Sequence, residues 1–232
     1  MTREEILQIA KPVLFNTKMV KAILNGKTVT RRVIKFPVNR FTKNAPVADN
    51  VQLEQIRSDK ANFHEAPFYG FDVKLPCSVG DILYVRETWN HYTHDIVGGS
   101  RKGYHEEGYF YKASPEMKST LPDYVQYHWG KKWKPSIHMP KEAARIFLKV
   151  NDVRVERLQD ITTQQILSEG INISEFDLPH NGIYAQFKRL WDSTIKKKDI
   201  AIYGWDANPY VWVIEFEKME VEEYQIGTKS IM

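Results

Sequence analysis

Residues 26–32, which read Gly-Lys-Thr-Val-Thr-Arg-Arg, place cations and hydroxyl groups close together. In an extended segment, Thr30 and Arg32 point to one side, and Lys27 and Arg31 point to the other. A cation and a hydroxyl at this spacing form a candidate polar site, in which Thr30 could attack a substrate with Lys27 as its base. The forked guanidinium of Arg31 or Arg32 suits a phosphate or a base edge. A solvated loop with a basic edge explains the same residues, and the spacing alone favours that explanation.

The elements predicted around this segment place it at a junction between a helix and a strand. Apolar residues recur at helical spacing over residues 17–25. Asn25 and Gly26 tolerate the positive φ that the C-terminus of a helix often needs. Residues 28–36 predict a strand that ends at Pro37. The Gly-Lys-Thr sequence echoes the end of a phosphate loop, but the first glycine of that motif is absent and a helix precedes it, so we reject that motif.

The rest of the chain shows short strands separated by single helices and long loops, which is typical of an α+β protein. We expect further helices over residues 3–9, 162–169 and 183–194, and further strands over residues 13–15, 82–89, 144–157 and 210–216. Insertions are expected at about residues 37–76 and 90–135, the first with a short helix over residues 51–56. Residues 219–232 are charged, and we expect them to form a flexible tail.

The composition limits the class of protein. A hydrophobic content of 42% is enough for a sizeable core, and a net charge of +4 is compatible with a nucleic-acid or nucleotide partner. Cys77 is the single cysteine, so no intrachain disulfide is possible and a reducing compartment is expected. No apolar run approaches the ~20 residues of a membrane span, and residues 1–10 lack the features of a signal peptide. We therefore expect a soluble cytoplasmic protein with no membrane partner.

Segments in five places occur in an order that resembles a known family. They are residues 27–32, 79–89 (VGDILYVRETW), 133–140 (WKPSIHMP), 153–170 and 208–216 (NPYVWVIEF). Together they resemble the ASCH domain family of the PUA-like group of RNA-associated barrels, and especially the larger ASCH-like proteins of bacteriophages and prophages. The resemblance implies a single domain over residues 12–218, in which a small mixed β-barrel has flanking helices and carries the two long insertions.

The resemblance also implies a site. Small bacterial ASCH amidohydrolases, which deacetylate N(4)-acetylcytidine, use a lysine, a threonine and a glutamate that correspond to Lys27, Thr30 and Glu169. The family usually has one residue between the glycine and the lysine, whereas Gly26 here abuts Lys27, and this shortening can re-aim Lys27. Two mechanisms are open: Thr30 attacks the amide, or Glu169 activates water while Lys27 polarises the carbonyl. A surface ion pair between Lys27 and Glu169 is the structural alternative.

Other residues are candidates for binding the substrate. By the same resemblance, Arg86, Glu87 and Trp89 end a strand near the site, while Ser136 and His138 lie in a loop that can form one wall of a pocket. Each has a structural alternative: a tryptophan that closes a strand is more often in the core, and a loop dense in polar and aromatic groups can simply be well packed.

The second insertion also carries cations among aromatic residues, a pattern suited to RNA. The residues are His105, Tyr124, Tyr127, His128, Trp129, Lys131, Lys132, Trp133 and Lys134. A solvated loop is the commoner explanation of such a cluster. His91 and His94 have the spacing of two metal ligands, but no third ligand is evident nearby, so we expect no metal and no cofactor.

The leading hypothesis is a hydrolase that acts on a modified nucleoside or base, most concretely on an N(4)-acetylcytidine-like amide through Lys27, Thr30 and Glu169. Arg31 and Arg32 join the substrate-binding candidates. One alternative is a non-catalytic RNA- or nucleotide-binding module that uses the same cleft, and a second alternative is a ribonuclease. In each case the expected partner is a modified nucleoside or RNA, and a monomer is favoured.

Overall fold

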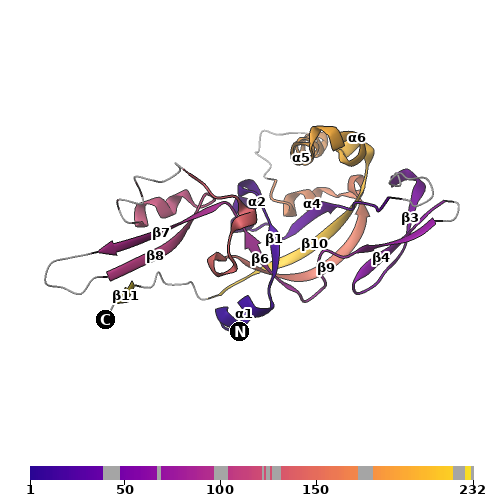
Figure 1. The fold of residues 1–232 in the computed structure, drawn as a ribbon. Helices are drawn as coiled ribbons and strands as arrows, with labels where there is room; N and C mark the ends of the chain where they lie inside the picture. Colours follow the sequence, from indigo (N-terminus) through magenta and orange to yellow (C-terminus); the bar gives the residue numbers. More distant parts are fainter. Residues whose placement is uncertain are drawn as a thin grey trace. The chain divides into compact units, whose positions relative to one another are not determined.

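The computed structural model describes residues 1–38, 48–66, 69–96, 104–121, 123, 126, 132–171, 180–221 and 228–230. The chain divides into two compact units, which we call unit 1 (Met1–Asn25, Ile82–Lys149 and Lys218–Met232) and unit 2 (Gly26–Asp81 and Val150–Glu217). Both units combine helices with open sheets (Figure 1), which confirms the α+β class, and no closed barrel is present in the described part of either unit. The span predicted as a single domain is shared between the two units.

Unit 1 contains short helices and two kinds of sheet. Its elements are α1 (Arg3–Ile9), β1 (Lys11–Leu14), α2 (Thr17–Leu24), β6 (Ile82–Arg86), β7 (Trp89–Ile96), β8 (Tyr104–Tyr111), the start of β9 (Phe147–Arg157) and β11 (Thr228–Ser230). In the order β1–β6–β9, β1 is parallel to β6, and β6 is antiparallel to β9. In the order β11–β8–β7, both pairings are antiparallel.

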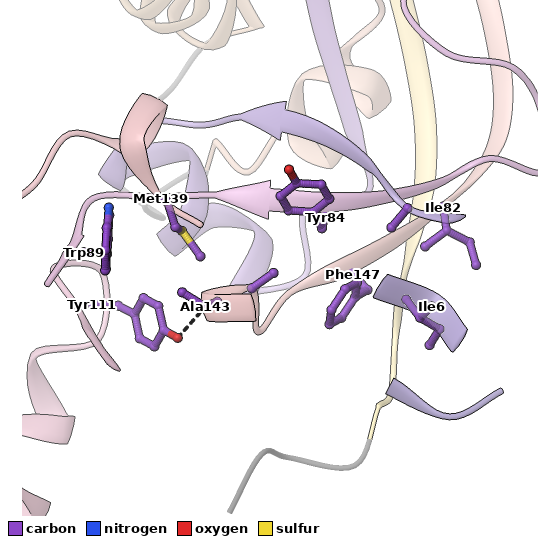
Figure 2. Packing of buried hydrophobic residues seen from close by; sticks show 10 residues of the cluster. Ile6, Ile82, Tyr84, Trp89, Tyr111, Met139, Ala143 and Phe147 are labelled. Carbon is purple, nitrogen blue, oxygen red and sulfur yellow. Dashed lines mark hydrogen bonds between the residues drawn. The ribbon is translucent and has the colours of Figure 1, made fainter. Parts of the chain in front are cut away.

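The core of unit 1 gathers around α1, β6 and the start of β9. Figure 2 shows Ile6, Tyr84 and Phe147 in this core, together with Tyr111, whose hydroxyl donates a 2.7 Å hydrogen bond to the carbonyl of Ala143. Helix α1 begins where the sequence predicts, because its N-cap threonine and the glutamate three residues later form a reciprocal capping box. This helix then buries Ile6 against the sheet.

Unit 2 contains the sheet that carries residues 29–33. Its elements are β2 (Val29–Val33), β3 (Val51–Ile56), β4 (Lys60–Glu65), β5 (Tyr69–Lys74), most of β9, α4 (Thr163–Ser168), α5 (His180–Thr194), α6 (Ile200–Tyr203) and β10 (Tyr210–Met219). In the order β9–β10–β2, β10 is antiparallel to β2, with Val213 opposite Arg31 and Ile214 opposite Thr30. A separate antiparallel sheet has the order β3–β4–β5.

Helices α4 and α5 cover one face of the β9–β10–β2 sheet. Val29 and Val213 from the strands pack there with Ile166 of α4 and Phe187 of α5. Because side chains alternate between the faces of a strand, Arg31 lies on the same face of β2 as Val29. The register of the sheet therefore decides which polar residues of β2 meet α4.

The structure corrects one detail of the sequence prediction and adds strands to three other segments. Residues 51–56, expected as a helix, form β3, where a register shift between Leu53 and Gln55 interrupts the alternation that identifies a strand. The insertions expected at 37–76 and 90–135 hold ordered strands, β3–β5 and β7–β8 respectively. The tail expected to be flexible contains β11, which pairs with β8.

Candidate functional site

Lys27 and Glu169 form a buried ion pair in unit 2. Lys27 Nζ donates a 2.6 Å hydrogen bond to Glu169 Oε2. Their side chains are only 6% and 7% exposed, so the pair is not the solvated surface contact considered as the structural alternative. A charged group at such burial is costly unless it is paired and hydrogen-bonded, and here each partner satisfies the other.

Arg31 binds the second oxygen of the same carboxylate. Its Nη1 donates to Glu169 Oε1 at 3.0 Å, and its Nη2 donates to Glu156 Oε2 at 3.0 Å. The side chain of Arg31 is 1% exposed, which makes it the most deeply buried cation of the group. The site therefore consists of two cations around Glu169, with a second carboxylate behind Arg31.

Glu156 is held in turn by Arg154, its neighbour on the same face of β9. Arg154 Nε donates to Glu156 Oε1 at 2.6 Å, and Arg154 Nη1 donates to Asp152 Oδ2 at 2.7 Å and also to Glu215. Burial alone would raise the pKa of Glu156, but hydrogen bonds from Arg154 and Arg31 outweigh it and lower the pKa below its ordinary value. Glu156 is therefore a carboxylate stabilised in its ionised form.

Local backbone structure explains how Lys27 and Glu169 meet. Gly26 has a φ of +95°, which allows the chain to leave α2 sharply just before Lys27. The N–H of Thr28 then donates to the carbonyl of Ser168, and the carbonyl of Thr28 accepts from the N–H of Phe216. Helix α4 starts with a capping box at Thr162 and has Glu169 as its C-cap residue. These contacts fix Lys27 just before β2 and Glu169 at the C-terminal end of α4.

Thr30 is not part of this hydrogen-bonded group. It follows Val29 and precedes Arg31 in β2, so its side chain leaves the opposite face of the strand. Its hydroxyl is buried and has no hydrogen-bond partner among the described residues. Arg32, on the same side as Thr30, is also largely buried, and that burial lowers the pKa of its guanidinium. The structure thus brings Lys27, Arg31 and Glu169 together and leaves Thr30 and Arg32 on the other face.

The remaining predicted binding residues belong to unit 1. Arg86 donates from Nε to the carbonyl of Met139 at 3.0 Å and also binds the carbonyl of Ile137, so it holds the 3-10 turn that contains Ser136 and His138. His138 is exposed and Ser136 is partly exposed. Arg86 thus binds the backbone on the C-terminal side of Ser136 and on either side of His138.

Glu87 and Trp89 have structural partners within unit 1. The fully buried Glu87 carboxylate accepts from Arg145 Nε at 2.8 Å and from Arg145 Nη2 at 3.1 Å. Burial raises the pKa of Glu87, and the hydrogen bonds and charge of Arg145 oppose this only in part. Trp89 is buried, and the Lys134 ammonium lies 4.8 Å from the centre of its ring. Arg145 is therefore the partner of Glu87.

Sequence reasoning missed Arg145, Arg154 and Glu156. For the last two, a signal was available, because Asp152, Arg154 and Glu156 alternate in charge at every second residue and therefore share one face of the predicted strand. Nothing local indicates that this face lies near Arg31, since that proximity depends on the strand order β9–β10–β2.

The predictions of an RNA-binding cluster, of no metal site and of no membrane span can be compared only with the described residues. Tyr124, Tyr127, His128, Trp129 and Lys131 of the predicted RNA-binding cluster lie outside the described residues. Across the residues that are described, no group of histidine, cysteine, aspartate or glutamate side chains is arranged to hold a metal ion. Within the same residues, no helix is both long and apolar enough to span a membrane.

Comparisons of the chain with protein-family models, with curated proteins and with solved structures find no match.

Proposed function

We propose that unit 2 carries an amidohydrolase site that acts on a modified nucleoside or base, with an N(4)-acetylcytidine-like amide as the substrate. The observation that carries the proposal is the buried 2.6 Å contact between Lys27 and Glu169, two residues that the resemblance to the ASCH amidohydrolases selects. Hydrolysis of an amide needs a base for the attacking group and a cation or donor for the developing oxyanion. An ionised carboxylate beside a lysine and an arginine offers both.

The geometry favours water, rather than Thr30, as the nucleophile in this proposal. From the described residues, each oxygen of Glu169 receives one hydrogen bond, Oε2 from Lys27 and Oε1 from Arg31. Each oxygen then keeps a further lone pair that can accept a proton from water. Lys27 has three N–H donors, and the contact with Glu169 uses one of them. Another can point at the substrate carbonyl. The hydroxyl of Thr30 lies on the other face of β2, away from the proposed base.

For the fold, we propose a PUA-like ASCH domain. The support is the position of the resembling segments: residues 27–32 enter β2, residues 153–170 run from β9 through α4, and residues 208–216 enter β10. In the same arrangement the C-terminal end of α4 meets the residue before β2 through the hydrogen bond between Thr28 and Ser168. These are the elements from which the resemblance takes its site residues.

A non-catalytic nucleotide-binding module is the second candidate, and one observation favours it. Both oxygens of Glu169 are already bound by cations, and no hydroxyl or thiol nucleophile among the described residues is hydrogen-bonded to this carboxylate. A carboxylate that is bound by two cations can serve to hold Lys27 and Arg31 in place for a ligand. A binding module retains affinity for the nucleoside without converting it.

The test is hydrolysis of N(4)-acetylcytidine, combined with equilibrium binding of the same compound. The wild-type chain is expected to release cytidine and acetate, and Glu169→Gln is expected to abolish turnover while it still folds. Arg189→Gln, a change of a residue of α5 outside the site, serves as the matched surface control. Tight binding without turnover supports the nucleotide-binding module. The absence of both binding and turnover overturns both candidates.

A further inference from the structure

We propose that Glu156 is a positioning residue of this site, which acts through Arg31 to hold the Glu169 carboxylate in place. The catalytic meaning of this inference rests on the proposed function, whereas its structural content does not. Glu156 makes no hydrogen bond to Glu169 or to Lys27 among the described contacts, so any influence it has on them passes through the guanidinium of Arg31.

Arg31 divides its donors between two carboxylates. One terminal nitrogen binds Glu169 Oε1 and the other binds Glu156 Oε2, both at 3.0 Å. A guanidinium is planar and rigid, so fixing one nitrogen also fixes the direction of the other. Glu156 therefore sets the angle at which Arg31 meets Glu169.

Glu156 is itself fixed. Its Oε1 accepts from Arg154 Nε at 2.6 Å, while its Oε2 accepts from Arg31, so the carboxylate is held between two arginines. Gln165, which completes the capping box at the start of α4, also donates from Nε2 to Oε1, at 3.5 Å. Glu156 is thus anchored to β9 on one side and lies next to the start of α4 on the other.

Lys27 and Arg31 are two buried cations, and Glu169 alone supplies one compensating charge. Glu156 supplies the second, and the lowered pKa of this carboxyl keeps it ionised. Without it, Arg31 would be drawn entirely to Glu169 and would compete with Lys27 for that carboxylate. A displacement of a reacting group by about 1 Å typically lowers the reaction rate about a hundredfold.

A double-mutant cycle in the unfolding equilibrium tests the structural content directly. The four proteins are wild type, Glu156→Gln, Glu169→Gln and the double variant, and the same four are made in an Arg31→Met background. With Arg31 present, the two substitutions are expected to be non-additive by roughly fivefold or more in the unfolding constant, as for residues that share a partner. With Arg31→Met, they are expected to be additive within about twofold.

Two results overturn the proposal. Additive effects in both backgrounds show that Glu156 and Glu169 are independent, and equal coupling in both shows that it does not pass through Arg31. If Glu169→Gln does not fold, Lys27→Met takes its place in the cycle, since it removes the other partner of Glu169.

Steady-state kinetics test the catalytic content. Glu156→Gln is expected to lower kcat about tenfold with little change in KM, which is the size typical of a lost positioning contact. Asp152→Asn, which makes the same chemical change in another partner of Arg154, is expected to leave both constants within about twofold. Equal losses in the two variants overturn the catalytic role of Glu156. If the wild type shows no turnover, the proposed function fails, and the unfolding cycle still decides whether Glu156 positions the pair.

Discussion

Lys27 Nζ lies 2.6 Å from Glu169 Oε2, although the two residues are 142 positions apart in the chain. Glu169 also binds Arg31 through its other oxygen, so one buried carboxylate contacts two buried cations. The three residues therefore contribute unequally to stability. Removing Glu169 leaves two cations with a lost partner, whereas removing Lys27 leaves Glu169 still paired with Arg31.

Glu169→Gln is therefore expected to destabilise the fold more than Lys27→Met does. Loss of one member of a buried ion pair typically costs about 3–5 kcal/mol, and we expect Glu169→Gln in that range and Lys27→Met below it. Chemical denaturation of both variants and the wild type measures the difference. An equal or larger loss for Lys27→Met would show that Arg31 does not compensate Glu169.

The lowered pKa of Glu156 predicts a specific dependence of stability on pH. The unfolded carboxyl titrates near 4.3, and the folded one titrates below that value because Arg154 and Arg31 bind it. The stabilisation is thus present above about pH 4.3 and is lost as pH falls through the folded pKa. Glu156→Gln is expected to lose stability at neutral pH and to show a shallower decline in acid. An unchanged acid slope in denaturation curves would contradict this.

The raised pKa of Glu87 predicts a dependence of stability on pH that has the opposite sign. Burial raises its folded pKa above the unfolded value, so the folded state binds the proton more strongly. Stability from this group is fully present below the unfolded pKa of about 4.3 and declines as pH rises through the folded pKa. Glu87→Gln, which mimics the protonated form, is expected to remove this decline. The measurement is unfolding of both proteins across the weakly acidic range, and parallel curves would refute the prediction.

Gly26 is expected to be sensitive to a side chain for conformational reasons alone. Its φ is +95°, and a Cβ placed there would meet nothing within 4 Å, so the cost of Gly26→Ala comes from the backbone. We expect roughly 1–2 kcal/mol of destabilisation. Gly182 in α5 also has open space around a new Cβ but lacks the positive φ, and Gly182→Ala is expected to be neutral or stabilising by up to about 1 kcal/mol. Thermal or chemical unfolding of this matched pair tests the claim.

The sequence predicts much of the regular structure because its signals are local. Helix α1 coincides with the predicted span 3–9, and α4 lies within the predicted span 162–169. Both are marked by capping residues that act within a few positions of the chain. Strand β3 was not predicted, because a register shift disturbs the alternation of apolar and polar residues over 51–56.

The candidate site shows where local signals end. The alternation of side chains in a strand correctly places Arg31 with Lys27 and separates both from Thr30, and the end of α4 gives the position of Glu169. The hydrogen bond between Arg31 of β2 and Glu156 of β9 depends on the strand order β9–β10–β2, in which one strand separates the two residues. The sequence pattern of either strand does not indicate this strand order, since strand order is set by long-range packing.

Thr30 allows the two mechanisms to be separated. If Glu169 activates water, Thr30→Val is expected to retain turnover within about tenfold, because the hydroxyl lies on the opposite face of β2 and the replacement keeps the side-chain shape. If Thr30 is the nucleophile, Thr30→Val abolishes turnover, and the wild type carries an acetyl group on Thr30 after cytidine leaves and before water releases acetate. Steady-state rates and intact-protein mass spectrometry after rapid quenching distinguish these results.

The most direct test of the account is the release of cytidine from N(4)-acetylcytidine, followed by chromatography at high enzyme concentration, for the wild type and for Glu169→Gln. The wild type is expected to turn over the substrate, and Glu169→Gln is expected to lose turnover while it remains folded by circular dichroism. No release of cytidine by the wild type, or equal release by both proteins, would contradict the assignment of the Lys27–Glu169 pair to amide hydrolysis.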